Sequence, residues 1–272
     1  MKYDDRLVAF IDILGFGNAV SSTVDSKGNE NEKEIVKIHE VFDLIQENWI
    51  NSDTDTHSKR VTIFSDSIVI SVKIDEKSQI FYTLLEIKHM IMSLVWCGFL
   101  VRGAVVRGKL IHEPSKVFGP ALVEAYTLES KAALYPRIIL DRELIAAAGK
   151  APSMQHDPET EREYVSALLE QDSDGMYYID YFFKASAELD DPDFQFPAYI
   201  MELADIIRKG LMGSVHPSNV DLKVKYSWMR ERYNKMVDTV HSGIDIDAGG
   251  AEYENDVLAA YSELKKISPY RK

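Results

Sequence analysis

The sequence predicts an α/β (α+β) fold of ferredoxin-like type, with a mixed, partly antiparallel sheet and a C-terminal helical extension. Short apolar runs alternate with segments of helical periodicity in the order β-α-β-β-α-β-α-β. Only helical periodicity follows the break at Asp190-Asp191-Pro192. A hydrophobic content of 46% in 272 residues is enough to fill a large core.

Each element has its own signal in the chain. Arg6–Leu14 is apolar on both faces, as in a central strand, and Glu32–Ile50 has the apolar stripe of an amphipathic helix. Lys59–Ile74 predicts two strands joined by a tight turn at Ser65-Asp66-Ser67. The further elements expected are a helix over 80–97, a strand over 99–111, a helix over 119–134, a strand over 136–140, a helix over 142–148 and a strand over 176–182. We expect the helices to cover one face of the sheet.

The C-terminal part of the chain predicts three helices, over 199–211, 220–240 and 252–267. We therefore expect a catalytic domain over residues 1–185 and a helical extension over 186–272 that packs on it.

Charge and cysteine content limit the classes of function. The net charge of −13, without long Lys/Arg blocks, disfavours nucleic-acid binding. Cys97 is the single cysteine, which excludes an internal disulfide and fits a reducing compartment. The longest apolar run, Met90–Val101, is shorter than the ~20 residues that span a bilayer. We therefore expect a cytoplasmic protein without stable membrane association.

Two aspartates lie inside strongly apolar segments. Asp12 is part of Val8–Leu14, and Asp66 is part of Val61–Ile70. A carboxylate away from water must be paired, protonated or bound to a metal, so two of them at neighbouring strand ends suit Mg²⁺ or Mn²⁺. Each also has a purely structural alternative. Asp12 pairs with Arg102, Arg107 or a backbone N–H in that case, and Asp66 is a favoured turn residue.

A glycine-containing turn follows the first strand. Gly15-Phe16-Gly17 precedes Asn18-Ala19-Val20, so a dinucleotide fingerprint fails at Val20, where its third glycine belongs. A turn at the start of a helix nevertheless has free backbone N–H groups, which can bind phosphate oxygens.

Four motifs, in order over residues 6–183, resemble those of class III nucleotidyl cyclases. They are Phe10-Ile11-Asp12-Ile13-Leu14-Gly15-Phe16, the hairpin Phe64-Ser65-Asp66-Ser67, the strand from Arg102 to Leu110, and the helix from Gly119 to Ser130. The resemblance implies that Asp12, Asp66 and the Ile13 carbonyl hold two divalent ions.

The resemblance also implies roles for other residues. The backbone of Gly15, Phe16 and Gly17 would bind the triphosphate, together with Arg137, whose alternative role is a solvent-exposed charge at a strand start. The family works as a head-to-tail homodimer on a nucleoside triphosphate, with active sites at the interface. In such a dimer Thr62 and Phe64 are candidates for contacting the base.

The departures from adenylate cyclases concern the base and the transition state. Thr62 replaces a lysine, Lys116 a base-reading aspartate, and Val123 and Thr127 replace an asparagine and an arginine on the helix. Arg107 is a candidate for stabilising the transition state, with a strand-edge ion pair as its alternative.

Retained metal aspartates with altered base-reading positions resemble the pyrimidine cyclases of bacterial Pycsar antiphage systems. That resemblance implies cyclic UMP or cyclic CMP as product, UTP favoured over CTP, and a separate effector that senses the product. The alternatives are a divergent adenylate or guanylate cyclase and a nucleotide-binding pseudoenzyme that acts as a dimeric sensor.

Overall fold

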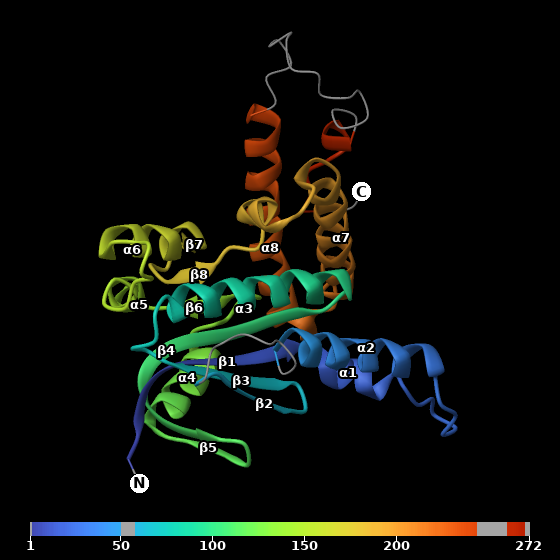
Figure 1. Cartoon of the computed structure of the whole chain (residues 1–272). Helices are drawn as coiled ribbons and strands as arrows, with labels where there is room; N and C mark the ends of the chain where they lie inside the picture. The colour runs from blue at the N-terminus through green and yellow to red at the C-terminus, as the bar shows by residue number, and fades with distance from the viewer. Residues whose placement is uncertain (1, 50–57, 244–259, 270–272) are drawn as a thin grey trace. The chain divides into compact units, whose positions relative to one another are not determined.

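The computed structural model describes residues 2–49, 58–243 and 260–269. The chain divides into two compact units, Met1–Asp180 and Tyr181–Lys272 (Figure 1). The domain limits expected at 1–185 and 186–272 stay a prediction, and the short 3₁₀ helix η1 (Phe183–Glu188) spans that boundary. Within the described ranges, no helix combines the length and hydrophobicity needed to cross a membrane.

The first unit is built around one mixed sheet. Its strands are β1 (Asp4–Leu14), β2 (Arg60–Phe64), β3 (Ser67–Lys73), β4 (Leu100–Glu113), β5 (Lys116–Phe118), β6 (Ile138–Leu140), β7 (Leu169–Gln171) and β8 (Tyr177–Ile179). The strand order is β2-β3-β1-β4-β6-β8-β7, and β5 pairs with β4 outside this path. The pairings among β2, β3, β1 and β4 are antiparallel, whereas β4 and β6 are parallel. The mixed sheet predicted from the sequence is confirmed.

The helices of the first unit are α1 (Phe16–Ser21), α2 (Glu32–Trp49), α3 (Gln79–Trp96), α4 (Pro120–Lys131), α5 (Arg142–Ala148) and α6 (Pro158–Ala167). Helix α2 connects β1 to β2 and α3 connects β3 to β4, which is the ferredoxin-like order predicted for this part of the chain. The helix predicted over Glu32–Ile50 is α2, and Ile50 lies outside the described residues.

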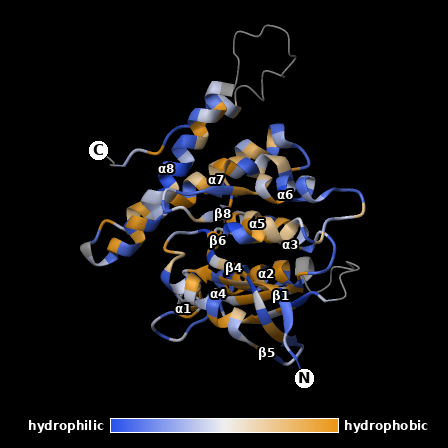
Figure 2. Cartoon of the chain, turned by 90° about the vertical axis from the view of Figure 1, so that its left-hand side faces the viewer, coloured by the Kyte–Doolittle hydropathy of each residue, from blue (hydrophilic) through white to orange (hydrophobic). Residues whose placement is uncertain are grey.

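The expectation that helices cover one face of the sheet is wrong. Ala121 and Ala125 of α4 pack against Val8 and Phe10 of β1, while α3 lies on the other side of β1 and β4 (Figure 1). Because β1 is buried on both faces, each face needs its own cover. The hydrophobic residues accordingly gather along β1 and β4, with hydrophilic residues over the outer loops (Figure 2).

The second unit is helical, as predicted. Helix α7 (Pro192–Gly213) contacts α8 (Val220–Gly243), and both bury aliphatic and aromatic side chains. Helix α7 begins seven residues before the predicted Tyr199, because Pro192 occupies a first-turn position that tolerates proline. Residues 252–259 of the third predicted helix lie outside the described residues.

Gly103 of β4 is a point where packing tolerates no side chain. A Cβ at this position would lie 2.6 Å from the Phe10 carbonyl oxygen and 3.2 Å from the Ile11 Cα. We expect Gly103→Ala to lower the free energy of unfolding by about 2 kcal/mol, because the neighbouring strand backbone must shift. Urea denaturation followed by circular dichroism measures this. Gly213→Ala, where a Cβ meets nothing within 4 Å, is the matched control. Equal stability of the two variants would contradict the tight β1–β4 approach.

Candidate functional site

The two predicted metal aspartates lie at the same edge of the sheet. Asp12 is near the end of β1 and pairs with Ser67, the first residue of β3. One residue further, the Ile13 amide donates a hydrogen bond of 2.9 Å to the Asp66 carbonyl oxygen. The backbone therefore places Asp12, Ile13 and Asp66 next to one another, as a shared metal site would require.

Asp12 is one of three charged side chains that form consecutive ion pairs on the α4 face of the sheet. Arg102, its partner on β4, places Nε 3.2 Å from Asp12 Oδ2 and 2.7 Å from Glu129 Oε1 of α4. Glu129 is buried, whereas the Asp12 side chain keeps 21% of its surface exposed. The predicted structural partner Arg102 is thus present, and it fixes the position of Asp12 without covering it.

Asp66 has a different environment. It follows Ser65, whose φ of 56° marks the tight turn between β2 and β3. The Asp66 side chain is half-buried, and none of the described residues forms a hydrogen bond or ion pair with its carboxylate. A carboxylate without a protein partner beside a second carboxylate is available to bind a cation.

The glycine turn adds amide donors to the same edge. Gly15 caps α1 with φ 76°, and the amides of Asn18 and Ala19 both donate to its carbonyl oxygen. The amides of Phe16 and Gly17 have no acceptor among the described residues, so they are available to phosphate oxygens. The Phe16 side chain is buried against Phe42, which anchors the turn.

The predicted base-contacting residues lie on the face of the sheet that Asp12 occupies. Phe64, Ser67, Asp12 and Arg102 form one row across four strands by register, and Thr62 lies in the next row, opposite Val69. Phe64 is 47% exposed, and its ring centroid is 6.4 Å from that of Phe10. Thr62 Oγ1 lies 2.8 Å from His112 Nε2.

Arg137 does not lie at this edge as an exposed charge. Its side chain is fully buried, and its guanidinium binds the carboxylates of Asp172 and Asp174. Partial burial alone would raise the pKa of Asp174, but the hydrogen bond from Arg137 lowers it below its ordinary value. The alternative of a solvent-exposed strand-start charge is therefore wrong, and the triphosphate role stays a prediction that this geometry does not favour.

Arg107 lies on the opposite face from Asp12. It pairs with Leu7 in the β1–β4 register, and its Nη2 is 2.8 Å from Asp5 Oδ2. The hydrogen bond from Arg107 lowers the pKa of the Asp5 carboxyl. The structure therefore separates Arg107 from Asp12. It gives Arg107 the strand-edge ion pair that was the alternative to a role in the transition state.

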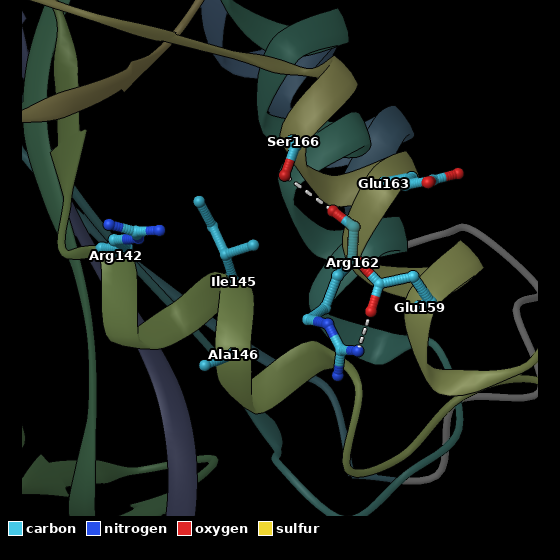
Figure 3. A pocket seen from close by; sticks show the side chains of 7 residues that line it. All are labelled: Arg142, Ile145, Ala146, Glu159, Arg162, Glu163 and Ser166. Carbon is cyan, nitrogen blue, oxygen red and sulfur yellow. Dashed lines mark hydrogen bonds and ion pairs between the residues drawn. The ribbon is translucent and has the colours of Figure 1, made fainter.

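Two cavities of the first unit lie apart from the predicted metal residues. One, of ≈ 450 Å³, lies between α5 and α6 and includes Arg142 and Arg162, the latter bound to Glu159 (Figure 3). The other, of ≈ 510 Å³, includes Arg107, Lys77 and Lys150. Neither of these two cavities is lined by Asp12 or Asp66.

No protein-family model matches the chain, and no curated protein matches it significantly. Among solved structures, the adenylyl cyclase CyaB from P. aeruginosa aligns over 66% of this chain and 95% of its own, with 11% identity and a TM-score of 0.45. Two structures of a bacterial light-regulated adenylyl cyclase cover 60% and 66% of this chain and 56% and 92% of their own, with 10% and 11% identity and TM-scores of 0.37 and 0.38. Sequence identity and TM-score are too low in all three cases to assign a function to this chain.

The side-chain partners of Glu129 and His112 could not be predicted from the sequence, which indicates for His112 only a surface or structural residue. Glu129 follows the buried Ala121 and Ala125 at four-residue spacing on α4, so helical periodicity alone indicates an inward-facing charge. His112 shares the alternating pattern of β4 with Arg102, which indicates a common face. Both signals are in the sequence, but they identify a face and not a partner.

A substitution at Arg137 separates its structural role from the predicted ligand role. We expect Arg137→Met to lower the free energy of unfolding by about 3 kcal/mol, because it removes the cation beside the buried Asp172 carboxylate. Arg142→Met, on the exposed start of α5, is the control. Both are compared by urea denaturation and by equilibrium binding of a nucleoside triphosphate. Unchanged stability with lost binding would instead favour a triphosphate-binding arginine.

His112 predicts a pH dependence of stability. Burial, together with the charges of Arg6 and Arg60, lowers the pKa of His112 from 6.5 to about 4. The unfolded state therefore binds more protons between these values, and stability falls as the pH drops from 6.5 towards 4. We expect this component to reach about 3 kcal/mol at pH 4 and to disappear in His112→Gln. Chemical denaturation at pH 7.5, 6, 5 and 4 measures it. An identical pH profile in both proteins would contradict the burial of a neutral imidazole.

Proposed function

We propose that this chain is a metal-dependent nucleotidyl cyclase. It converts a pyrimidine nucleoside triphosphate, UTP in preference to CTP, to the 3′,5′-cyclic monophosphate and pyrophosphate. The observation that carries the proposal is the juxtaposition of Asp12 and Asp66, joined by the backbone hydrogen bond from Ile13, beside the free amides of Phe16 and Gly17.

The donor set suits hard divalent cations. Asp12 and Asp66 supply carboxylate oxygens, and the Ile13 carbonyl is the further ligand proposed from the family resemblance. Over the described ranges, no three His, Cys, Asp or Glu side chains cluster as a metal site, so substrate phosphates and water would complete the coordination. Two Mg²⁺ or Mn²⁺ ions held here would lower the pKa of the ribose 3′-OH and neutralise the triphosphate.

The surrounding residues support substrate binding at this edge. We expect the Phe16 and Gly17 amides to donate to the β- and γ-phosphates, since they have no acceptor among the described residues. Arg102 holds Asp12 in place and also contacts the Glu129 carboxylate, so that one cation is shared by two carboxylates. These residues would bind and orient the substrate, and the aspartates would hold the cations that neutralise its charge.

The choice of a pyrimidine follows from the positions that differ from adenylate cyclases. Thr62 stands where that family has a lysine, and its hydroxyl is bound to His112. Lys116 stands where it has a base-reading aspartate, and its ammonium lies 3.0 Å from Glu113. A Lys/Asp pair for reading adenine is therefore missing, which supports a different base. The antiviral signalling role, with a separate effector that senses the product, is proposed on the resemblance to Pycsar cyclases.

A homodimer is part of the proposal. Phe64, Val123 and Tyr126 are exposed by 47%, 65% and 55%, and the Phe10 ring contacts both Phe64 and Tyr126. An exposed aromatic surface beside the aspartates fits a second copy of the chain at the site. In such a dimer the partner chain would also help to enclose the substrate at this edge.

A second candidate is a nucleotide-binding sensor without turnover. Helix α4 presents Val123 and Thr127 where cyclases carry an asparagine and an arginine, and the Thr127 hydroxyl donates to the Val123 carbonyl of its own helix. That face thus lacks the donors expected for a developing phosphorane charge. A divergent adenylate or guanylate cyclase is the remaining enzymatic alternative.

Incubation with ATP, GTP, CTP and UTP in the presence of Mn²⁺, followed by mass analysis, tests the activity. We expect a cyclic pyrimidine monophosphate, and we expect Asp66→Ala to lower its rate by at least ~100-fold, because a metal ligand is lost. Asp66 is a half-buried turn residue without a side-chain partner among the described residues, so the variant should keep wild-type stability within ~1 kcal/mol. Asp75→Ala, an exposed aspartate after β3, is the control.

The outcomes separate the candidates. A cyclic purine product would move the assignment to an adenylate or guanylate cyclase. Metal-dependent nucleotide binding without any product, lost in Asp66→Ala, would favour the sensor. A product made equally well by Asp66→Ala would contradict the assignment of Asp66 as a metal ligand.

A further inference from the structure

A continuous chain of hydrogen bonds lies behind Thr62 on the α4 face of the sheet. Arg6 Nε donates to Ser71 Oγ at 2.9 Å, Ser71 Oγ lies 2.8 Å from His112 Nδ1, and His112 Nε2 lies 2.8 Å from Thr62 Oγ1. Arg6, Ser71 and His112 are buried, whereas Thr62 is partly exposed. The chain thus runs from the interior to a residue that a ligand can reach.

The direction of the hydrogen bonds follows from the groups involved. A guanidinium can only donate, so Ser71 Oγ accepts from Arg6. Among the described residues, the Ser71 hydroxyl hydrogen has one possible acceptor, His112 Nδ1. Nδ1 is therefore the unprotonated nitrogen, and Nε2–H donates to Thr62 Oγ1. The hydroxyl hydrogen of Thr62 is left to donate elsewhere.

The opposite direction is disfavoured. If Nδ1–H donated to Ser71, the fully buried Ser71 hydroxyl would lose its acceptor and keep the whole cost of desolvation. A protonated imidazole would donate from both nitrogens, but burial and the charges of Arg6 and Arg60 lower the pKa of His112 to about 4. The neutral imidazole with a protonated Nε2 is the state that satisfies every buried group at neutral pH.

Resting on the proposed function, we propose that Arg6, Ser71 and His112 are positioning residues that fix the Thr62 hydroxyl as a hydrogen-bond donor. The site then selects a nucleotide base that presents a carbonyl oxygen at the edge Thr62 reads. Uracil has a carbonyl, which accepts the Thr62 hydroxyl hydrogen, at the position where cytosine has an amino group. An amino group can only donate to the remaining lone pair of Thr62, and it leaves the hydroxyl hydrogen without an acceptor. The preference for UTP over CTP therefore depends on Arg6, Ser71 and His112, which orient Thr62 but do not touch the substrate.

The neighbouring side chain agrees with this geometry. Phe64 follows Thr62 by two residues on the same strand, so both side chains emerge on one face. The exposed Phe64 ring offers a surface on which a base can stack while its edge meets Thr62. Guanine and adenine differ by the same carbonyl and amino groups, so GTP and ATP provide a second matched pair.

Substitution of Thr62 tests the donor directly. We expect wild-type protein to favour UTP over CTP in kcat/KM, and Thr62→Val to lower this ratio about tenfold, the value of one hydrogen bond. Thr62→Ser, which keeps the hydroxyl, should retain the preference. An unchanged ratio in Thr62→Val, or a wild-type preference for CTP, would overturn the proposal.

Substitution behind Thr62 tests the positioning role. Ser71→Ala removes the group that fixes the His112 tautomer, so Thr62 can reverse its hydrogen bond and the preference should fall. His112→Gln, whose amide N–H replaces Nε2–H, should preserve it. Circular dichroism and thermal melting establish that each variant is folded. A loss of total activity in Ser71→Ala with an unchanged UTP/CTP ratio would indicate only a structural role. It would overturn the proposed relay of hydrogen bonds from Arg6 through Ser71 and His112 to Thr62.

Binding provides a readout that does not need turnover. The dissociation constants of 3′-deoxy-UTP and 3′-deoxy-CTP are measured with Mn²⁺ for wild type, Thr62→Val and Ser71→Ala. A preference for the uridine analogue that the substitutions abolish supports the relay even if no cyclic product forms, in which case only the proposed turnover fails. Equal binding of both analogues by the wild type, or binding of neither, overturns the relay.

Discussion

The register of β1 between β3 and β4 is the constraint on which the site depends. β1 is paired along most of its length on both sides, with Asp12 opposite Ser67 and Arg102. A slip of one residue would turn Asp12 to the other face and bring Ile11 or Ile13 to its place. Burial of both faces of β1 makes such a slip costly, because each apolar side chain has a matched neighbour. The hydrophobic pattern that forms the core therefore also determines which face the Asp12 carboxylate of the candidate site occupies.

The register also places the polar side chains of this face in two separate groups along the strands. Asp12 and Arg102 share one row, which Glu129 of α4 completes. Towards the other end of the strands lie Arg6, Ser71 and His112, whose side chains are hydrogen-bonded to one another. Phe10 and Val69 lie between the two groups and belong to the apolar cluster under α4. An anionic group and a hydrogen-bonding group are thus held apart on one rigid surface.

Much of the fold could be predicted because its strands are long and strongly apolar. The β2–β3 hairpin, the crossover helices α2 and α3 and the approach of Asp12 to Asp66 follow from periodicity and from turn chemistry. Helix α6 was missed because its composition is polar. Its signal is nevertheless present, since the Asp157 side chain caps the amides of Glu159 and Thr160 and Pro158 follows at the first helical position.

Side-chain partners at long range could not be predicted in the same way. Arg137 precedes a short strand, and nothing local indicates that Asp172 and Asp174 fold back onto it. Arg107 and Arg102 lie five residues apart on one strand, so alternation puts them on opposite faces, but only the structure shows that Asp12 pairs with Arg102. Local pattern thus determines which face a residue occupies, and the choice of partner depends on how distant segments meet.

The separation of the two polar groups bears on why a dimer would be needed. Within one chain, the row of Thr62 is displaced from the row of Asp12 by two residues, about 7 Å along the strand. In an isologous dimer, a residue i that contacts j of the partner is matched by j contacting i of the partner. Such a two-fold symmetric pair would then set the carboxylate group of one chain opposite the Thr62 group of the other, twice. The exposed aromatic residues Phe64 and Tyr126 lie where such an interface would form, which gives their exposure a physical reason.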